Sequence, residues 1–395
     1  MFLLITEHTT VITVADKIFH NPQLDTILIK LASRCNINCS YCYVYNMGDS
    51  NWSSMEKQMT ESTMVAIAKS LAELADFQNQ KFSIVLHGGE PLLIGAKKLD
   101  FLLSLLRDSL NEEYPISIQT NGILITSEIL DICSKNRTSV AVSIDGYKEI
   151  NDRFRIGHNN KGTFDQVVKG IDILKSHSDH EFLNAGLLAV IDPSSDAEKI
   201  YSFFKELEAP SVDFLYKDGN HTILPLGKAT VNSTEYGEWM TKLLNVYLND
   251  KNPLPIRILD DMLKVLLGGT VSKEGMGITD YGIAIIDTNG VIMKNDTLKS
   301  SFDGADKFKK PINIKDGKLL DFIASKEFNE YRQMQRPSSE KCLDCPILDI
   351  CGGGMILHRW KDGAQFNNPS VYCSDQQLLV ENMSQLISKF YQVNA

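Results

Sequence analysis

The first half of the chain alternates short apolar runs with amphipathic stretches. The short runs predict six strands, at residues 25–33, 81–89, 115–122, 139–146, 182–191 and 211–217. Between them, stretches such as 61–77 and 99–110 place apolar residues three and four positions apart, which predicts helices. Because parallel neighbours need crossover connections, strands and helices in this order predict a parallel α/β sheet.

The strand candidates are nearly continuous in apolar residues, which predicts strands buried on both faces. An open doubly wound sheet and a partial barrel both fit this pattern. Several strands end in polar or glycine-rich clusters, at residues 33–35, 87–91, 119–122 and 143–146. In parallel α/β folds, ligands bind at the carboxyl ends of strands. We therefore expect these clusters to meet in one binding site.

The alternation of strands and helices ends after about residue 220. Two helices are predicted at 234–248 and 256–269, followed by a hairpin over 282–299 that turns at Thr288, Asn289 and Gly290. We expect an N-terminal strand segment at 1–24, the α/β unit at 25–225 and a smaller second domain at 226–395. In the first segment, residues 9–16 could bind a peptide by β-addition.

Charge and composition exclude several classes of protein. The net charge of −10 offers no basic excess for binding nucleic acid. No apolar run has the length of a membrane span, and the N-terminal residues lack a signal-peptide pattern. We therefore expect a cytoplasmic protein without a membrane or nucleic-acid partner. In that compartment, its eight cysteines are expected to bind metal more than to form disulfides.

Three of the cysteines, Cys35, Cys39 and Cys42, follow the first predicted strand with the spacing C-x3-C-x2-C. A closed zinc site normally has four ligands, so three thiols fit it poorly. A [4Fe–4S] cluster takes one thiolate per iron, and three thiolates leave one iron open to another ligand. A structural zinc or iron loop is the alternative.

This spacing, with Tyr41 directly before Cys42, resembles the motif of the radical S-adenosylmethionine (radical SAM) superfamily. The resemblance implies a partial (β/α)6 TIM-like barrel followed by a smaller C-terminal domain. It also implies that S-adenosylmethionine binds the open iron through its amino and carboxylate groups. The reduced cluster then cleaves the sulfonium and releases a 5′-deoxyadenosyl radical.

The strand-end clusters resemble further motifs of the same family, and the resemblance implies that they bind the cofactor. Gly88, Gly89 and Glu90 belong to a GGEP motif that receives the methionine ammonium. Gln119 and Asn121 match the third-strand motif, and Ser143 the S-x-D-G motif. Residues 151–155 resemble H-D-x-x-R with Asn in place of His, which implies that Arg155 holds the methionine carboxylate, with Arg153 as the alternative.

A second group of cysteines, Cys342, Cys345, Cys351 and Cys373, is large enough to close a metal site. A zinc ribbon is one interpretation. The group also resembles the SPASM domain of peptide-modifying radical SAM enzymes, which has further cysteines where this chain has Asn295 and Met355. The resemblance implies that one auxiliary cluster is lost and the other complete, hence two [4Fe–4S] clusters in total. Cys133, in an apolar helical stretch, is expected to be a packing residue.

The SPASM resemblance implies a precursor peptide as substrate and an electron donor such as flavodoxin or ferredoxin. Residues 287–299, 351–354 and 368–375 resemble the cyclophane-forming (triceptide) maturases of the Xenorhabdus–Yersinia–Erwinia type. These join an aromatic ring carbon to the β-carbon of a residue two positions later. The reaction needs a base. The candidates, for this role or for substrate positioning, are Asp296 and Asp287, with Asp218 and His221 in reserve.

Several alternatives remain open. The nearest are other SPASM enzymes, either a sulfatase-type maturase that oxidises Ser or Cys or a thioether-forming peptide synthase. A non-catalytic iron–sulfur electron carrier would have four cysteines at each cluster, which Cys35, Cys39 and Cys42 contradict. A zinc-binding interaction module conflicts with the same spacing. The complete auxiliary cluster either carries electrons or is structural.

Overall fold

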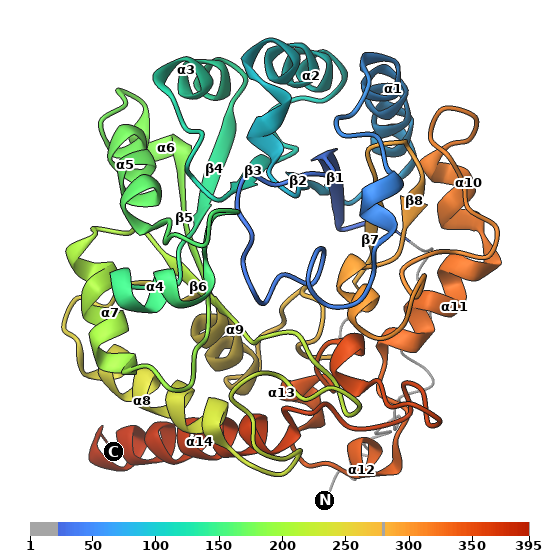
Figure 1. Cartoon of the computed structure of the whole chain (residues 1–395). Coiled ribbons are helices and arrows are strands. Elements are labelled where there is room, and N and C mark those ends of the chain that lie inside the picture. Colours follow the sequence, from blue (N-terminus) through green and yellow to red (C-terminus); the bar gives the residue numbers. More distant parts are fainter. Residues whose placement is uncertain (1–22, 279–280, 395) are drawn as a thin grey trace, which may run out of the picture.

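A computed structural model of the protein describes residues 23–278 and 281–394. One eight-stranded sheet lies at its centre, in the order β6-β5-β4-β3-β2-β1-β7-β8. Its strands are β1 (Thr26–Ala32), β2 (Ser83–Gly88), β3 (Ile116–Thr120), β4 (Thr138–Ser143), β5 (Asn184–Val190), β6 (Val212–Leu215), β7 (Ile283–Ile286) and β8 (Ile292–Met293). The first six pair in parallel, each with the next, and curve around a central space (Figure 1). The predicted strands and the partial barrel are confirmed.

Helices cover the outside of this curved sheet (Figure 1). Those of the barrel are α1 (Glu61–Phe77), α2 (Ala96–Ser109), α3 (Ser127–Lys135), α4 (Lys148–Phe154), α5 (Phe164–Lys175), α6 (His180–Leu183) and α7 (Ala197–Glu206). Capping residues define where several helices begin. The side chains of Thr60, Thr126 and Asp196 accept hydrogen bonds from backbone N–H groups in the first turns of α1, α3 and α7. Two 3-10 helices, η1 (Asn51–Ser54) and η2 (Pro91–Ile94), lie in the loops after β1 and β2.

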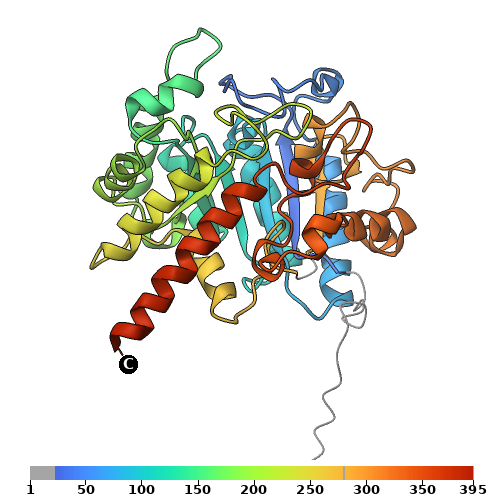
Figure 2. The same ribbon diagram turned by 90° about the horizontal axis from the view of Figure 1, so that it is seen from below.

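The remaining elements follow β6. They are α8 (Glu235–Asn249), α9 (Arg257–Leu266), η3 (Asp296–Ser300), α10 (Leu319–Ala324), α11 (Lys326–Gln335), α12 (Glu340–Leu343), α13 (Leu348–Cys351), η4 (Ile356–Arg359) and α14 (Cys373–Asn394). Figure 2 shows α14 running along one side of the molecule. No helix of the described residues has both the length and the apolar character needed to cross a membrane.

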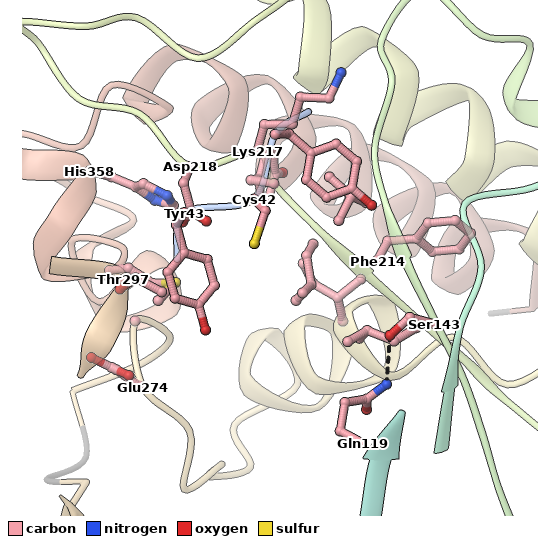
Figure 3. A pocket seen from close by; sticks show the side chains of 18 of the residues that line it. Cys42, Tyr43, Gln119, Ser143, Phe214, Lys217, Asp218, Glu274, Thr297 and His358 are labelled. Atoms are coloured by element: carbon pink, nitrogen blue, oxygen red, sulfur yellow. Dashed lines mark hydrogen bonds between the residues drawn. The ribbon is translucent and has the colours of Figure 1, made fainter. Parts of the chain in front are cut away.

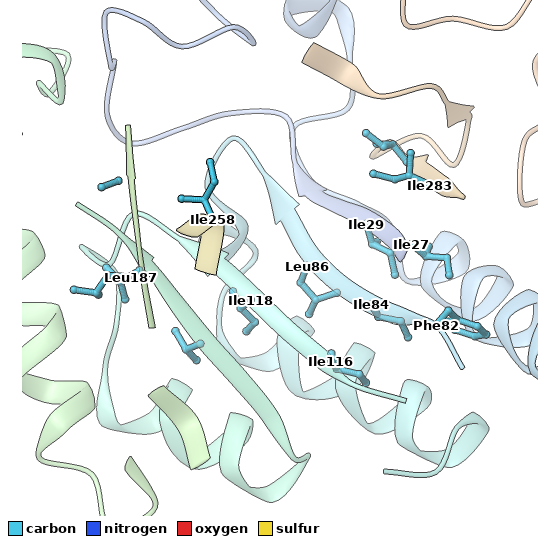
Figure 4. Close-up of a cluster of buried hydrophobic side chains, with 14 of the residues drawn as sticks. Ile27, Ile29, Phe82, Ile84, Leu86, Ile116, Ile118, Leu187, Ile258 and Ile283 are labelled. Atoms are coloured by element: carbon cyan, nitrogen blue, oxygen red, sulfur yellow. The ribbon is translucent and has the colours of Figure 1, made fainter. Parts of the chain in front are cut away.

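Strands β2, β3 and β4 are buried on one face and half-buried on the other, unlike the sequence expectation, whereas the second half of β1 and most of β6 are buried on both faces. Along β2 and β3, Ile84, Leu86, Ile116 and Ile118 are buried in the core beneath the helices (Figure 4). The residues between them alternate to the other face and are only half-buried. That face lines the cavity described below, so the polar residues at strand ends point inward.

The predicted hairpin forms and extends the barrel sheet. Strand β7 pairs in parallel with β1, and β8 returns antiparallel to β7. Residues beyond the expected boundary at 225 therefore contribute strands to the first unit, and the division of the chain into domains stays a prediction. The expected peptide-binding strand at 9–16 lies outside the described residues.

A fully buried ion pair joins the start of α14 to the loop before α8. Lys228 Nζ lies 2.6 Å from Asp375 Oδ2, and neither side chain is exposed to solvent. The backbone N–H of Gly237 in α8 donates to Asp375 Oδ1 at 2.8 Å. Because Asp375 is two residues beyond Cys373, this pair anchors the last cysteine of the second group to the barrel.

Candidate active site

The loop after β1 places Cys35, Cys39 and Cys42 on the wall of a cavity of about 380 Å³. Further walls come from the carboxyl ends of β2, β3 and β4, through Gly88, Gly89, Gln119, Asn121 and Ser143. The polar clusters that follow separate strands in the sequence thus meet at one cavity.

The three thiols are in surroundings that disfavour charge. Burial raises the pKa of Cys35 to about 12 and that of Cys42 to about 11. Bound iron would supply the positive charge that stabilises thiolates. The described residues contain no group of three or more His, Cys, Asp or Glu side chains arranged around a single metal ion. A [4Fe–4S] cluster takes its thiolates on separate irons, so this donor set fits the cluster that the sequence motif implies.

Two glycines allow the end of β2 to pack directly against the cysteine loop. A Cβ added to Gly89 would lie 2.3 Å from the Arg34 carbonyl oxygen and 1.9 Å from the Tyr45 hydroxyl. A Cβ on Gly88 would lie 2.4 Å from the Ala32 carbonyl oxygen. Since such contacts are impossible, only glycine fits here, and the N–H of Gly89 donates to Ala32 O at 2.8 Å.

Glu90 joins the ends of two strands. Its side chain is fully buried, and Oε1 accepts from the Thr120 hydroxyl at 2.7 Å and from the Leu92 N–H at 3.0 Å. Oε2 accepts from the Asn121 N–H at 2.9 Å. Glu90 is not among the described residues that line the cavity. Glu90 therefore holds the Thr120–Asn121 segment in place, whereas Gly88 and Gly89 line the cavity.

Gln119 and Ser143 lie together on one side of the cavity. Gln119 Nε2 donates to Ser143 Oγ at 2.9 Å (Figure 3). Asn121 Nδ2 donates to Asn36 Oδ1 at 2.7 Å, which ties the third strand end to the cysteine loop. These contacts orient the polar side chains before any ligand binds.

Arg155 lines the cavity, whereas Arg153 does not. Arg155 is 6% exposed, and its Nη1 donates to the Tyr41 hydroxyl at 3.1 Å. That hydroxyl donates in turn to Asp145 Oδ2 at 2.7 Å. Arg155 Nε has no hydrogen-bond partner among the described residues. Arg153 instead donates to Asp192 Oδ2 at 2.6 Å, and its side chain is 45% exposed.

Two of the four candidate bases form a buried ion pair network with Lys30 on β1. Lys30 Nζ lies 2.6 Å from Asp296 Oδ2 and 3.8 Å from Asp287 Oδ2. Burial raises the pKa of Asp296, but Lys30, His87 and Lys299 together outweigh burial, and the net shift of the pKa is downward. Among the described residues, the cavity walls include neither carboxylate.

The two reserve candidates differ from each other. His221 Nε2 donates to the Pro369 carbonyl at 2.7 Å and joins the loop after β6 to the C-terminal region, away from the cavity walls. Asp218, three residues beyond the end of β6, lies on the cavity wall. Of the four residues that the sequence singled out as bases, Asp218 is the one that lines the cavity.

Further cavity residues were not found by sequence reasoning. Tyr43, Thr297, His358 and Glu274 lie on the same side as Asp218, opposite Gln119 and Ser143 (Figure 3). Burial raises the pKa of Glu274 to about 7, while burial and Arg359 lower that of His358 to about 3. Tyr43, next to Cys42, and Thr297, within the segment 287–299 that the sequence singled out, carried a sequence signal, whereas Glu274 and His358 did not.

All four cysteines of the second group line one small cavity formed by α12, α13 and the first turn of α14. Cys351 also lines the main cavity, so it lies in the wall between the two cysteine groups. Met355 is in the wall of the main cavity as well. Asn295 caps η3, where its Oδ1 accepts from the Thr297 N–H at 3.1 Å. Cys133 is buried in the core, as predicted.

Comparison with known proteins finds a matching family model and similar enzymes. Residues 29–202 match the model of the Radical SAM superfamily. The chain is 25% identical over 382 residues to a cysteine-type anaerobic sulfatase-maturating enzyme of Clostridium novyi (strain NT), covering 91% of this chain and 96% of that enzyme. It is 24% identical over 352 residues to a serine-type anaerobic sulfatase-maturating enzyme of Bacteroides thetaiotaomicron, covering 82% and 81%.

Solved structures share the fold. Native anSMEcpe with bound AdoMet superposes with a TM-score of 0.77 at 23% identity, covering 92% of this chain and 98% of that chain. Streptococcus suis SuiB bound to precursor peptide SuiA superposes with a TM-score of 0.61 at 16% identity, covering 89% and 76%. The α/β architecture therefore extends through most of the chain.

The cavity, the three-cysteine loop and the family match define the class of this protein. It is a radical SAM enzyme, and the part of the chain that matches the superfamily model is residues 29–202. Its cofactors include S-adenosylmethionine and a [4Fe–4S] cluster.

Proposed function

We propose that the protein is a radical SAM maturase that oxidises a side chain of a peptide or protein, in the manner of the sulfatase-maturating enzymes. The observation that carries this proposal is the match to a cysteine-type sulfatase-maturating enzyme over 91% of the chain and 96% of the relative. This favours oxidation of a Cys or Ser residue, the alternative that the sequence left open, over cyclophane formation.

Cys35, Cys39 and Cys42 would hold the [4Fe–4S] cluster. Gly88, Gly89, Gln119, Asn121, Ser143 and Arg155 would hold S-adenosylmethionine, because they line the same cavity as the three thiols. When bound, the cluster and cofactor supply a hydrogen-abstracting radical. The chain contributes the buried guanidinium of Arg155 for the cofactor carboxylate, and Tyr41 orients this guanidinium.

Replacing Arg155 by lysine is expected to raise the KM for S-adenosylmethionine by about 10-fold or more, because a lysine lacks the planar fork that binds a carboxylate bidentately. The measurement is 5′-deoxyadenosine formation against cofactor concentration. Arg153→Lys is the matched control and is expected to leave this KM unchanged, since Arg153 pairs with Asp192. Equal effects of the two substitutions would contradict the assignment.

Cys342, Cys345, Cys351 and Cys373 would hold a second [4Fe–4S] cluster, without an open iron. Cys351 lies in the wall of the main cavity, which would bring this cluster close to the substrate. Oxidation of a side chain releases an electron, and a nearby cluster is a suitable acceptor. At the positions where the SPASM pattern has further cysteines, Asn295 caps a helix and Met355 lines the cavity.

The substrate would enter the cavity from the side formed by Asp218, Tyr43, Thr297 and His358. Structures similar in fold have been solved with peptides: anSMEcpe with the Cp18Cys peptide and SuiB with its precursor peptide SuiA. A reduced flavodoxin or ferredoxin would supply the first electron, and such donors fit a cytoplasmic enzyme.

Cyclophane formation is the second candidate, supported by residues 287–299. In the structure this segment forms the end of the β7–β8 hairpin and η3, and Thr297 lines the cavity. The segment that resembles the triceptide maturases therefore reaches the place where a substrate would bind.

The test uses anaerobically reconstituted enzyme with S-adenosylmethionine, dithionite and one of two peptides. The first is Cp18Cys, and the second contains a three-residue aromatic-x-x motif. We expect 5′-deoxyadenosine together with a mass change at the cysteine of Cp18Cys. A loss of two hydrogens from the aromatic peptide, with no fragmentation between the joined residues, would favour the second candidate. Turnover of neither peptide would overturn the proposal.

A further inference from the structure

We propose that Asp218 is the catalytic base, the group that accepts the proton lost by the substrate after hydrogen abstraction. This inference rests on the proposed function. It assigns the proton transfer to the loop after β6 and not to the buried carboxylates of the β7–β8 hairpin.

Position supports the assignment. Asp218 lies beyond the carboxyl end of β6 and lines the cavity that contains Cys35, Cys39 and Cys42. Figure 3 shows its carboxylate near Tyr43 and His358, on the side opposite Gln119 and Ser143. The cofactor contacts and the proposed base would therefore face each other across the space that receives the substrate.

Among the described residues, the carboxylate of Asp218 also has no side-chain partner. No hydrogen bond or ion pair joins it to another side chain within residues 23–278 and 281–394. Asp296, by contrast, is 2.6 Å from the Lys30 ammonium, which lowers its affinity for a proton. A base must reach the proton that it abstracts, and within the cavity walls Asp218 meets this condition whereas Asp287 and Asp296 do not.

The electrostatic surroundings of Asp218 suit proton transfer. Burial, with a smaller effect of the Asp296 charge, raises the pKa of Asp218 to about 7. A base with a pKa near the working pH combines a useful fraction of carboxylate with affinity for a proton. Two other titratable groups lie on the same side of the cavity in Figure 3. The pKa of His358 is lowered to about 3, which makes it a poor proton acceptor. Glu274, whose pKa is also raised to about 7, accepts a hydrogen bond from Asn295 Nδ2 and is therefore engaged, unlike Asp218.

The bound cofactor would supply the radical that removes one hydrogen atom from the substrate β-carbon. The substrate radical would then lose a proton and an electron. The proton would pass to a carboxylate oxygen of Asp218, and an oxidised [4Fe–4S] cluster held by the second cysteine group would accept the electron. With a cysteine substrate the proton leaves the thiol and a carbon–sulfur double bond forms. The peptide loses two hydrogens in all.

The experiment uses reconstituted holoenzyme and Cp18Cys deuterated at the cysteine β-carbon. In a single turnover, Asp218→Asn is expected to transfer deuterium to 5′-deoxyadenosine as the wild type does, while product formation falls at least about 100-fold. Asp218→Glu, which keeps a carboxylate, is expected to restore part of the product. Asp165→Asn, at a side chain 74% exposed, is the matched control and is expected to leave both readouts unchanged.

Iron content and circular dichroism of each variant confirm that it has folded. Product formation by Asp218→Asn at the wild-type rate would overturn the role of Asp218 and leave the proposed function intact. Absence of deuterium transfer in the wild type would overturn both. Loss of deuterium transfer in Asp218→Asn alone would also overturn the inference, because it would place Asp218 before the proton step.

Discussion

Replacing Cys39 by alanine is expected to abolish the cleavage of S-adenosylmethionine. The cavity offers three thiols to a cluster, and the loss of one leaves two irons without a protein ligand. Formation of 5′-deoxyadenosine should fall to the background of a reaction without enzyme. Iron in the reconstituted protein should fall from about eight to about four per chain, because the second cysteine group is unaffected.

Cys133→Ala provides the matched control for this prediction. Cys133 is buried, as Cys39 is, but it lies in α3, packed in the hydrophobic core. Its replacement removes one sulfur from the core, which costs about 1 kcal/mol of stability. Iron content and cofactor cleavage should remain at wild-type values. Cleavage by Cys39→Ala at the rate of Cys133→Ala would show that the cluster is held elsewhere.

Replacing Asp375 by alanine is expected to lower the free energy of unfolding by about 3–5 kcal/mol, because the Lys228 ammonium is left buried without its partner. Both side chains are fully buried, and Asp375 also accepts from the Gly237 N–H. The measurement is the urea concentration at the unfolding midpoint, followed by circular dichroism on reconstituted protein. Chemical denaturation reports the change as a lower midpoint.

Glu330→Ala is the control for the Asp375 substitution. Glu330 pairs with Lys326 at the surface, where the side chains are 55% and 90% exposed. Exposed pairs of this kind contribute about 0.5 kcal/mol or less, so its midpoint should barely move. A midpoint for Asp375→Ala close to that of Glu330→Ala would mean that water reaches Lys228 in solution.

Much of the fold was predictable because it depends on local patterns. Residues 61–77, predicted as a helix, are helical over that range. Five of the six barrel strands fall within a predicted run, and β4 begins one residue before its run, at Thr138. The apolar spacing of a helix and the short runs of a strand are properties of neighbouring residues. The predicted burial of both strand faces was wrong for β2, β3 and β4, because His87, Gln119 and Ser143 alternate inward and line a cavity.

Some of the candidate site residues were likewise predictable from local patterns, and others were not. The cysteine spacing and the strand-end motifs predicted a common site because strand order places their loops at one end of a parallel sheet. Spacing could not separate Arg155 from Arg153, since the direction of each guanidinium depends on the turn after α4. Spacing also could not show that the Glu90 carboxylate accepts hydrogen bonds from the Thr120 hydroxyl and the Asn121 N–H and does not line the cavity.

The sequence of this protein specifies the alternation of strands and helices, the two cysteine groups and the cofactor motifs, because each lies within a few neighbouring residues. The three-dimensional fold decides which carboxylate can act. Asp287 and Asp296 lie close to the Lys30 ammonium, although Lys30 is more than 250 residues earlier in the sequence. They do so because β7 pairs with β1. Asp218 reaches the cysteine loop only because β6 ends at the same edge of the sheet as β1, and long-range pairing of strands leaves no local trace in a sequence.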